Sequence, residues 1–249
     1  MLVADESAGA STPLGAVGPA AVAPPTSAIS RRTRRQVPGE IDRLLLRHLG
    51  EGRATRSGTI ALVAAAGCAV MRWASIDHGS LVEHLSAIRE YEPLHVVMAR
   101  LPLSLVAPTT HLPVWGAVAQ VLVVFWLAEL NLGARRTVVL IVLFHTTATI
   151  AGRLMIRLGP DTWLHLGVAH SVAFTRDTGP SAAVVGLCVY LGCAVRAPIL
   201  AGLVAAAMVA ELLWKPDLAG REHVVAMLVA LLVAVPLLVR PAATAPVAS

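Results

Sequence analysis

The sequence contains few charged residues and almost no lysine. Charged residues make up 14% of the 249 residues, and Lys215 is the single lysine among 20 basic residues. Soluble proteins carry roughly 25% charged residues. Hydrophobic residues instead make up 56%, with a mean hydropathy of +0.72. This composition excludes an ordinary soluble domain and indicates several transmembrane helices, each of which needs about 20 apolar residues.

Cysteine is also scarce, and no ligand pattern for a metal or cofactor is present. Cys68, Cys188 and Cys193 all lie inside apolar segments, without the spacing of a disulfide or zinc site. The arginines flank apolar runs instead of forming a basic soluble surface, so we expect the lipid bilayer and no nucleic acid as a partner. The cysteines are predicted to be small buried residues, with no metal and no cofactor bound.

Six apolar segments can be read along the chain, which predicts an all-α membrane protein with one six-helix bundle. The second and third segments are separated by Arg135 and Arg136, and the fourth and fifth by Arg196. The fourth and sixth are short, so we expect them to begin below the membrane surface. The predicted spans are 57–76, 111–131, 137–157, 179–195, 197–214 and 222–239.

The segments outside the bundle have a different composition. Residues 1–36 are rich in Ala, Pro, Gly and Ser and are predicted to be a disordered cytoplasmic tail. Residues 37–56 are predicted to be an amphipathic juxtamembrane segment, 57–240 the membrane domain, and 241–249 a short cytoplasmic tail. The loop of about 34 residues after the first span contains two stretches with helical spacing, which favour short helices that form a structural flap.

The arginines predict the orientation. Eight arginines precede the first span, and the others named above, with Arg240, fall on the same side of a six-span bundle. Because basic residues accumulate in cytoplasmic loops, both chain ends are predicted to be cytoplasmic in a multi-pass plasma-membrane protein. Spans two, four and six would then all begin on the outer side.

Ser181 and His223 are the clearest candidates for catalytic residues. Ser181 follows Gly179 and Pro180 at the start of the fourth span, and His223 lies in the predicted first turn of the sixth. A serine hydroxyl needs a base to become a nucleophile, and histidine is the usual one. The helix start near Ser181 offers unpaired N–H groups that can stabilise an oxyanion. We therefore predict a nucleophile and base at similar depth in the membrane.

A stripe of small residues can bring the two helices together. Ala226, Ala230 and Ala234 recur at every fourth position after His223, and Ala182 and Gly186 are small residues of the fourth span. Such small-xxx-small stripes allow transmembrane helices to approach closely. The alternative is that alanine is simply abundant in this chain.

These features resemble the rhomboid family of intramembrane serine proteases over about residues 57–239. The shared features are the six-span plan, the long first outer loop, Gly179-Pro180-Ser181-Ala182 at the fourth span, and His223 with its small-residue spacing. The chain resembles the divergent rhomboid-like proteins of actinobacteria more closely than it resembles the proteases. The resemblance implies a six-transmembrane-helix rhomboid-like bundle in which Ser181 is the nucleophile and His223 the base, and in which a transmembrane protein substrate is cut near its outer end.

The chain departs from the rhomboid pattern in two places. Rhomboid proteases place a His and an Asn on the second helix to hold the oxyanion, but no asparagine lies near Ala117, and His111 is two residues out of register. Ala182 also replaces the glycine that follows the nucleophile. The predicted supporting residues are His111, Gly179 and Ala182, and an inactive rhomboid-like protein that binds membrane clients remains an alternative.

Two further polar residues lie inside the predicted spans. His145, in span three, is expected to make a helix-to-helix hydrogen bond, or else to serve as a proton relay. Glu129, at the end of span two, is expected to bond to a neighbouring helix or to Arg135. A transporter or channel component is a third alternative, which would depend on His145.

Overall fold

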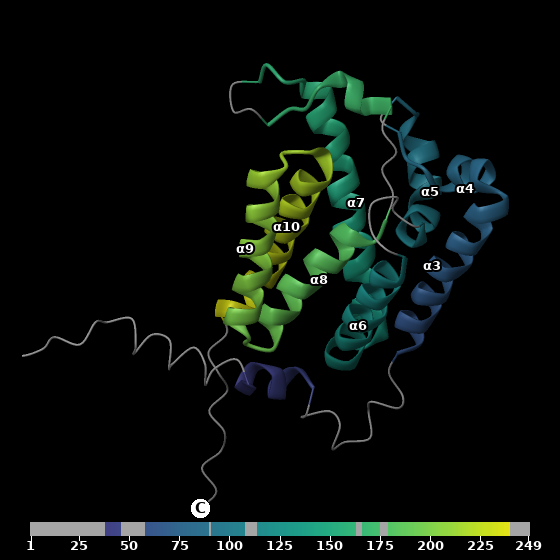
Figure 1. The fold of residues 1–249 in the computed structure, drawn as a ribbon. Helices are drawn as coiled ribbons and strands as arrows, with labels where there is room; N and C mark the ends of the chain where they lie inside the picture. The colour runs from purple at the N-terminus through teal and green to yellow at the C-terminus, as the bar shows by residue number, and fades with distance from the viewer. Residues whose placement is uncertain are drawn as a thin grey trace, which may run out of the picture.

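The computed structural model describes residues 38–45, 58–89, 91–107, 114–162, 166–174 and 179–239, and over these residues every regular element is a helix. A short helix over 38–44 precedes the bundle (Figure 1). The helices that follow are α3 (Thr59–Asp77), α4 (Gly79–Ser86), α5 (Leu94–Val106), α6 (Val114–Leu132), α7 (Ala134–Leu158), the 3₁₀ helix η1 (His170–Phe174), α8 (Ser181–Ala194), α9 (Pro198–Trp214) and α10 (Leu218–Val239).

Four of these helices, α3, α6, α7 and α10, are long and apolar enough to cross a membrane. α8 has 14 residues and α9 has 17. At 1.5 Å per residue, α8 is about 21 Å long, less than the roughly 30 Å of a bilayer's hydrocarbon core. All six segments that were predicted to be spans are helices. The ends of these helices lie within four residues of the predicted span ends.

α8 is the central helix of the bundle, and α9 is peripheral. α8 contacts α6, α7, α9 and α10, and it packs most extensively against α10. Every residue from Ala182 to Leu187 is buried, whereas Ala201 is the one buried residue of α9. Because protein surrounds α8, its backbone and side chains need little contact with lipid, and a short helix suffices there.

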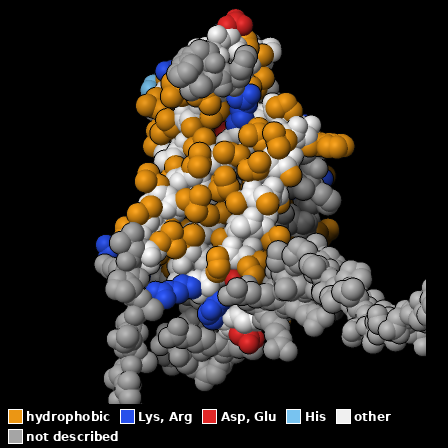
Figure 2. Space-filling model, turned by 90° about the vertical axis from the view of Figure 1, so that its left-hand side faces the viewer, with side chains coloured by type: hydrophobic (Ala, Val, Ile, Leu, Met, Phe, Trp, Pro, Cys, Tyr) orange, Lys and Arg blue, Asp and Glu red, His pale blue; other side chains and the backbone are white. Residues whose placement is uncertain are grey.

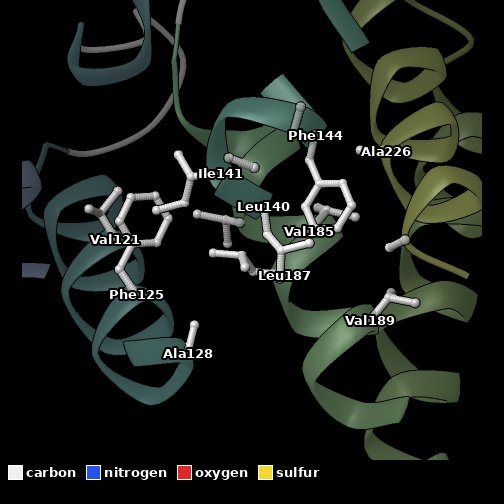
Figure 3. Packing of buried hydrophobic residues seen from close by; sticks show 14 of the residues in the cluster. Val121, Phe125, Ala128, Leu140, Ile141, Phe144, Val185, Leu187, Val189 and Ala226 are labelled. Atoms are coloured by element: carbon white, nitrogen blue, oxygen red, sulfur yellow. The ribbon is translucent and has the colours of Figure 1, made fainter. Parts of the chain in front are cut away.

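The core forms where α6, α7, α8 and α10 meet, with residues of α3 packed beside α6 (Figure 3 shows part of it). Phe125 on α6 and Phe144 on α7 are almost completely buried. The ring of Phe144 lies so close to Gly186 of α8 that an added Cβ would be 2.5 Å from it. Glycine at this position therefore lets α7 and α8 approach closely.

The alanine stripe of α10 is buried, as predicted. Ala226, Ala230 and Ala234 have no exposed surface, and the first two belong to the main core cluster with residues of α8. The outer surface shows the opposite pattern, because Leu213 is 80% exposed and Leu232 is 72% exposed. Figure 2 shows hydrophobic side chains through the middle of one face, with charged ones mainly toward its two ends. Such a surface fits a bilayer.

The long loop after α3 contains two helices, α4 and α5, as its spacing predicted. Arg153 of α7 is buried, and its guanidinium donates to the carbonyl oxygens of Arg89 at 3.1 Å and Glu92 at 2.7 Å. Arg100 of α5 forms an ion pair with Glu92 at 2.6 Å and also donates to the carbonyl of Ala87. These arginines attach the turn between α4 and α5 to the bundle.

Two carboxylates accept backbone amides at the starts of α3 and α9, at the end of the bundle away from the turn between α4 and α5. Glu129 of α6 accepts the N–H groups of Thr59 and Ile60 at 3.2 and 2.9 Å, at the start of α3. Glu40, which is 2% exposed, accepts those of Ile199 and Leu200 at 3.1 and 2.9 Å, at the start of α9. The first amides of a helix have no partner within it, and a carboxylate also interacts favourably with the helix dipole.

The helix over 38–44 therefore packs against the bundle instead of lying apart from it. Besides the Glu40 contact, Asn131 of α6 donates to the carbonyl of Leu44 at 3.2 Å. The predicted bond of Glu129 to a neighbouring helix is confirmed. The neighbouring helix is α3, whose first amides donate to the Glu129 carboxylate. The predicted tails 1–36 and 241–249 lie outside the described residues.

Candidate functional site

Ser181 is the first residue of α8, so it lies in the first turn of this helix, as predicted. Gly179 precedes it with a φ of +127°, a backbone conformation that favours glycine, and Pro180 is the residue before the helix. Pro180, the residue before the helix, makes no capping hydrogen bond with its side chain. The N–H groups of Ser181, Ala182 and Ala183 have no carbonyl partner one turn earlier in the helix, and Ser181 itself is partly exposed.

The predicted supporting residues differ in what they can contribute. The N–H of Gly179 donates to the carbonyl of Ser104 at 2.9 Å, so it is not available to an oxyanion in this arrangement. Ala182 is buried at the start of α8, where its own amide lies in the first turn. His111 lies outside the described residues, and its predicted role stays a prediction.

His223 lies one turn deeper in its helix than the sequence suggested. α10 begins at Leu218, four residues before the predicted start, because the carboxylate of Asp217 accepts the N–H of Gly220 at 2.9 Å. An aspartate at this position is a strong N-cap signal that the span prediction did not use. His223 is therefore in the second turn of α10, and it is buried.

The two nitrogens of His223 have different surroundings. Nδ1 lies 3.2 Å from Oε2 of Glu211 on α9. Nε2 is buried and has no hydrogen-bond partner among the described residues. No hydrogen bond joins Ser181 to His223 in that part of the chain either. The predicted pair thus lies on two helices that pack together, and the described residues show no hydrogen bond between the hydroxyl and the imidazole.

A different serine and histidine do form a hydrogen bond in the structure. Ser104 Oγ of α5 lies 2.8 Å from His145 Nε2 of α7, and both residues are buried. The Ser104 hydroxyl donates to the carbonyl of Leu101 at 3.0 Å. When the Ser104 hydroxyl donates to Leu101, its oxygen accepts from Nε2 of His145, since a hydroxyl has one proton. The bond confirms the expected helix-to-helix role of His145.

The pair formed by Ser104 and His145 also positions the start of α8. The carbonyl of Ser104 holds Gly179, two residues before Ser181. Sequence reasoning did not identify Ser104, which is one polar residue within an apolar helix. A buried serine opposite a buried histidine could have signalled the contact only if the packing of α5 against α7 had been known.

Charged residues gather where α9 joins α10. Lys215 and Asp217 form an ion pair at 2.9 Å. The hydrogen bond and the charge of Asp217 raise the pKa of the exposed Lys215. Partial burial tends to raise the pKa of Asp217, but the Gly220 N–H and the Lys215 ammonium outweigh it and lower that pKa below its usual value.

Glu222 lies beside His223 but faces another helix. Its carboxylate is buried and lies directly against Gly152 of α7, where an added Cβ would overlap it. Arg221 donates to the carbonyl of Leu166 at 3.0 Å.

Over the described residues, no three His, Cys, Asp or Glu side chains gather as metal ligands. Comparison of the chain with protein-family models, with curated proteins and with solved structures finds no match.

Proposed function

We propose that the chain is a rhomboid-like intramembrane serine endopeptidase. In this proposal the six helices α3, α6, α7, α8, α9 and α10 cross the plasma membrane, with both chain ends in the cytoplasm. The observation that carries the proposal is the state of His223, whose buried Nε2 has no partner while Nδ1 is held by Glu211. A buried polar atom without a partner is costly, and such costs are concentrated at functional sites.

The proposed chemistry follows from the two residues. Ser181 Oγ attacks the scissile carbonyl carbon of a transmembrane substrate near its outer end, and its proton passes to His223 Nε2. The carbonyl oxygen becomes an oxyanion close to the first-turn amides of α8. The C–N bond then breaks as His223 returns the proton to the leaving amine, and water hydrolyses the acyl-enzyme. Catalytic hydrogen bonds are often long without substrate, so the missing Ser181–His223 bond is compatible with this scheme.

A serine-directed fluorophosphonate tests the proposal. Ser181 Oγ would attack phosphorus and displace fluoride, which leaves a covalent label on the protein. We expect wild type to be labelled and Ser181→Ala not to be labelled. Ser75→Ala is the matched control, because Ser75 Oγ donates to the carbonyl of Met71 in its own helix and has no other hydrogen bond among the described residues. Absence of label on wild type, or equal labelling of Ser181→Ala, would contradict the proposal.

A second candidate function is client binding without cleavage. It is supported by the lack of a Ser181–His223 hydrogen bond among the described residues and by the engagement of the Gly179 amide with Ser104. Under this alternative, a membrane client would co-purify equally with wild type and Ser181→Ala, and neither would cleave it. Client cleavage that disappears in Ser181→Ala would exclude it.

A further inference from the structure

The surroundings of His223 select one form of its imidazole. An ionised carboxylate can only accept hydrogen bonds, so Nδ1 of His223 must carry the proton in its 3.2 Å contact with Oε2 of Glu211. When the ring is neutral it carries one proton, which leaves a lone pair on Nε2. Nε2 is the buried nitrogen without a partner in the described part of the chain. The contact with Glu211 therefore leaves the unpartnered nitrogen able to accept a proton.

Glu211 is well placed for this role by the packing of α9 against α10. It lies near the end of α9, 12 residues before His223, and the turn at 215–217 folds the two helices side by side. The side chain of His223 is 11% exposed and that of Glu211 is 44% exposed. The imidazole is thus enclosed, while the carboxylate that orients it reaches it from the more accessible side.

The other charged groups near His223 make their hydrogen bonds with other partners, although the charge of Asp217 also interacts with the imidazole. Asp217 pairs with Lys215 and caps α10, and Glu222 lies against Gly152 of α7. Arg221 donates to Leu166, and α8 presents Ser181 at its start. Among the described residues, Glu211 is the acidic residue whose hydrogen bond to the His223 ring is observed.

We propose that Glu211 is a positioning residue that holds His223 in the tautomer with the proton on Nδ1 and the lone pair on Nε2. This inference rests on the proposed serine protease function and adds a carboxylate to the pair of Ser181 and His223. The resemblance to rhomboid proteases assigns roles to Ser181 and His223 but none to Glu211, so this role would be a property of the present chain. Buried carboxylates in serine protease triads contribute about 10⁴-fold to the rate. Since Glu211 is partly exposed, we expect a smaller contribution, about tenfold or more.

Nitrogen-15 NMR of histidine-labelled protein in detergent tests the tautomer without any assay of activity. The His223 signals are assigned by their loss in His223→Gln, and spectra are recorded at a pH where the ring is neutral. We expect wild type to show the proton on Nδ1 and Glu211→Leu to show a mixture or the opposite tautomer. Glu211→Gln should retain the Nδ1 proton, since its amide oxygen also accepts. A proton on Nε2 in wild type, or an unchanged spectrum in Glu211→Leu, would overturn the inference.

Labelling kinetics with the fluorophosphonate supply the second measurement. We expect the maximal labelling rate to fall about tenfold or more in Glu211→Leu and less in Glu211→Gln, while the probe concentration for half-maximal rate stays the same. Glu83→Gln is the matched control, because Glu83 has a similar exposure of 42% and pairs with Arg89 on the flap. Equal rates in wild type and Glu211→Leu would overturn the inference. Lack of label on wild type would overturn the protease function instead, and the NMR result would still decide the tautomer.

Discussion

The two ends of the helical bundle differ in how their buried polar groups are hydrogen-bonded. At the end that holds the helix over 38–44, Glu40 and Glu129 each accept two backbone amides at the start of a helix. At the opposite end, the cap residue of α8 is Pro180, which makes no side-chain hydrogen bond, and His223 Nε2 is buried without a partner among the described residues. Satisfied polar groups stabilise a fold, whereas unsatisfied ones cost free energy. The imidazole of His223 is therefore the polar group whose burial costs the fold free energy, whereas Glu40 and Glu129 stabilise helix starts.

The largest effect on the free energy of unfolding is expected from a change in the packed middle of the bundle, between its two ends. We expect Gly186→Ala to lower the free energy of unfolding by about 1–3 kcal/mol, because its Cβ would be 2.5 Å from the Phe144 ring. Thermal unfolding in detergent measures this change. Gly202→Ala on α9 is the matched control, since nothing lies within 4 Å of its added Cβ, and it should leave stability unchanged or raise it by about 0.5–1 kcal/mol. Equal effects of the two variants would contradict the close α7–α8 contact.

The satisfied end can be tested through Glu40. We expect Glu40→Gln to lower the free energy of unfolding by about 0.5–2 kcal/mol, because the amide loses the charge that favours the start of α9 and one of its two acceptor oxygens. Asp42→Asn removes an exposed acid from the same helix and serves as the control. The same unfolding measurement applies to both. If Asp42→Asn destabilised the protein as much, the capping role of Glu40 would be wrong.

The smallest effect is expected from Asp217, in the turn before α10. Its pKa is lower in the folded protein than the ordinary value of about 3.9, so its contribution to stability is fully present above that value. The contribution is lost as the pH falls through the lowered pKa of the folded state. Unfolding temperatures measured between about pH 3 and 6 should therefore fall more for wild type than for Asp217→Asn. Parallel curves for the two proteins would show that Asp217 has no such role.

Much of the fold could be predicted because long apolar segments bounded by arginine have few alternatives to helices that cross a membrane. All six segments are helices, and the alanine stripe of α10 is buried. The largest error in a helix start concerned α10, where the capping by Asp217 was not recognised. The predicted first-turn position of His223 was wrong for the same reason, whereas that of Ser181 was confirmed.

The candidate site could be predicted only in part. Ser181 and His223 were identified by residue type and position. The hydrogen bonds around them come from residues distant in the sequence. Glu211 and Ser104 could not have been assigned their roles from spacing, because the first acts through the turn between α9 and α10 and the second through α5. Gly179 was expected to support an oxyanion, and its amide is instead bonded to Ser104.

The amino-acid sequence alone determined that this chain is helical and suited to a bilayer, because composition and the length of apolar runs decide where a backbone without water must bond to itself. Only the tertiary structure decided which polar groups meet. The bonds of Glu40 to the start of α9, of Ser104 to His145 and of Glu211 to His223 depend on how helices pack, with residues up to 160 positions apart. Local residue patterns set each helix, whereas the close packing of glycine and alanine faces sets which side chains lie within hydrogen-bond distance.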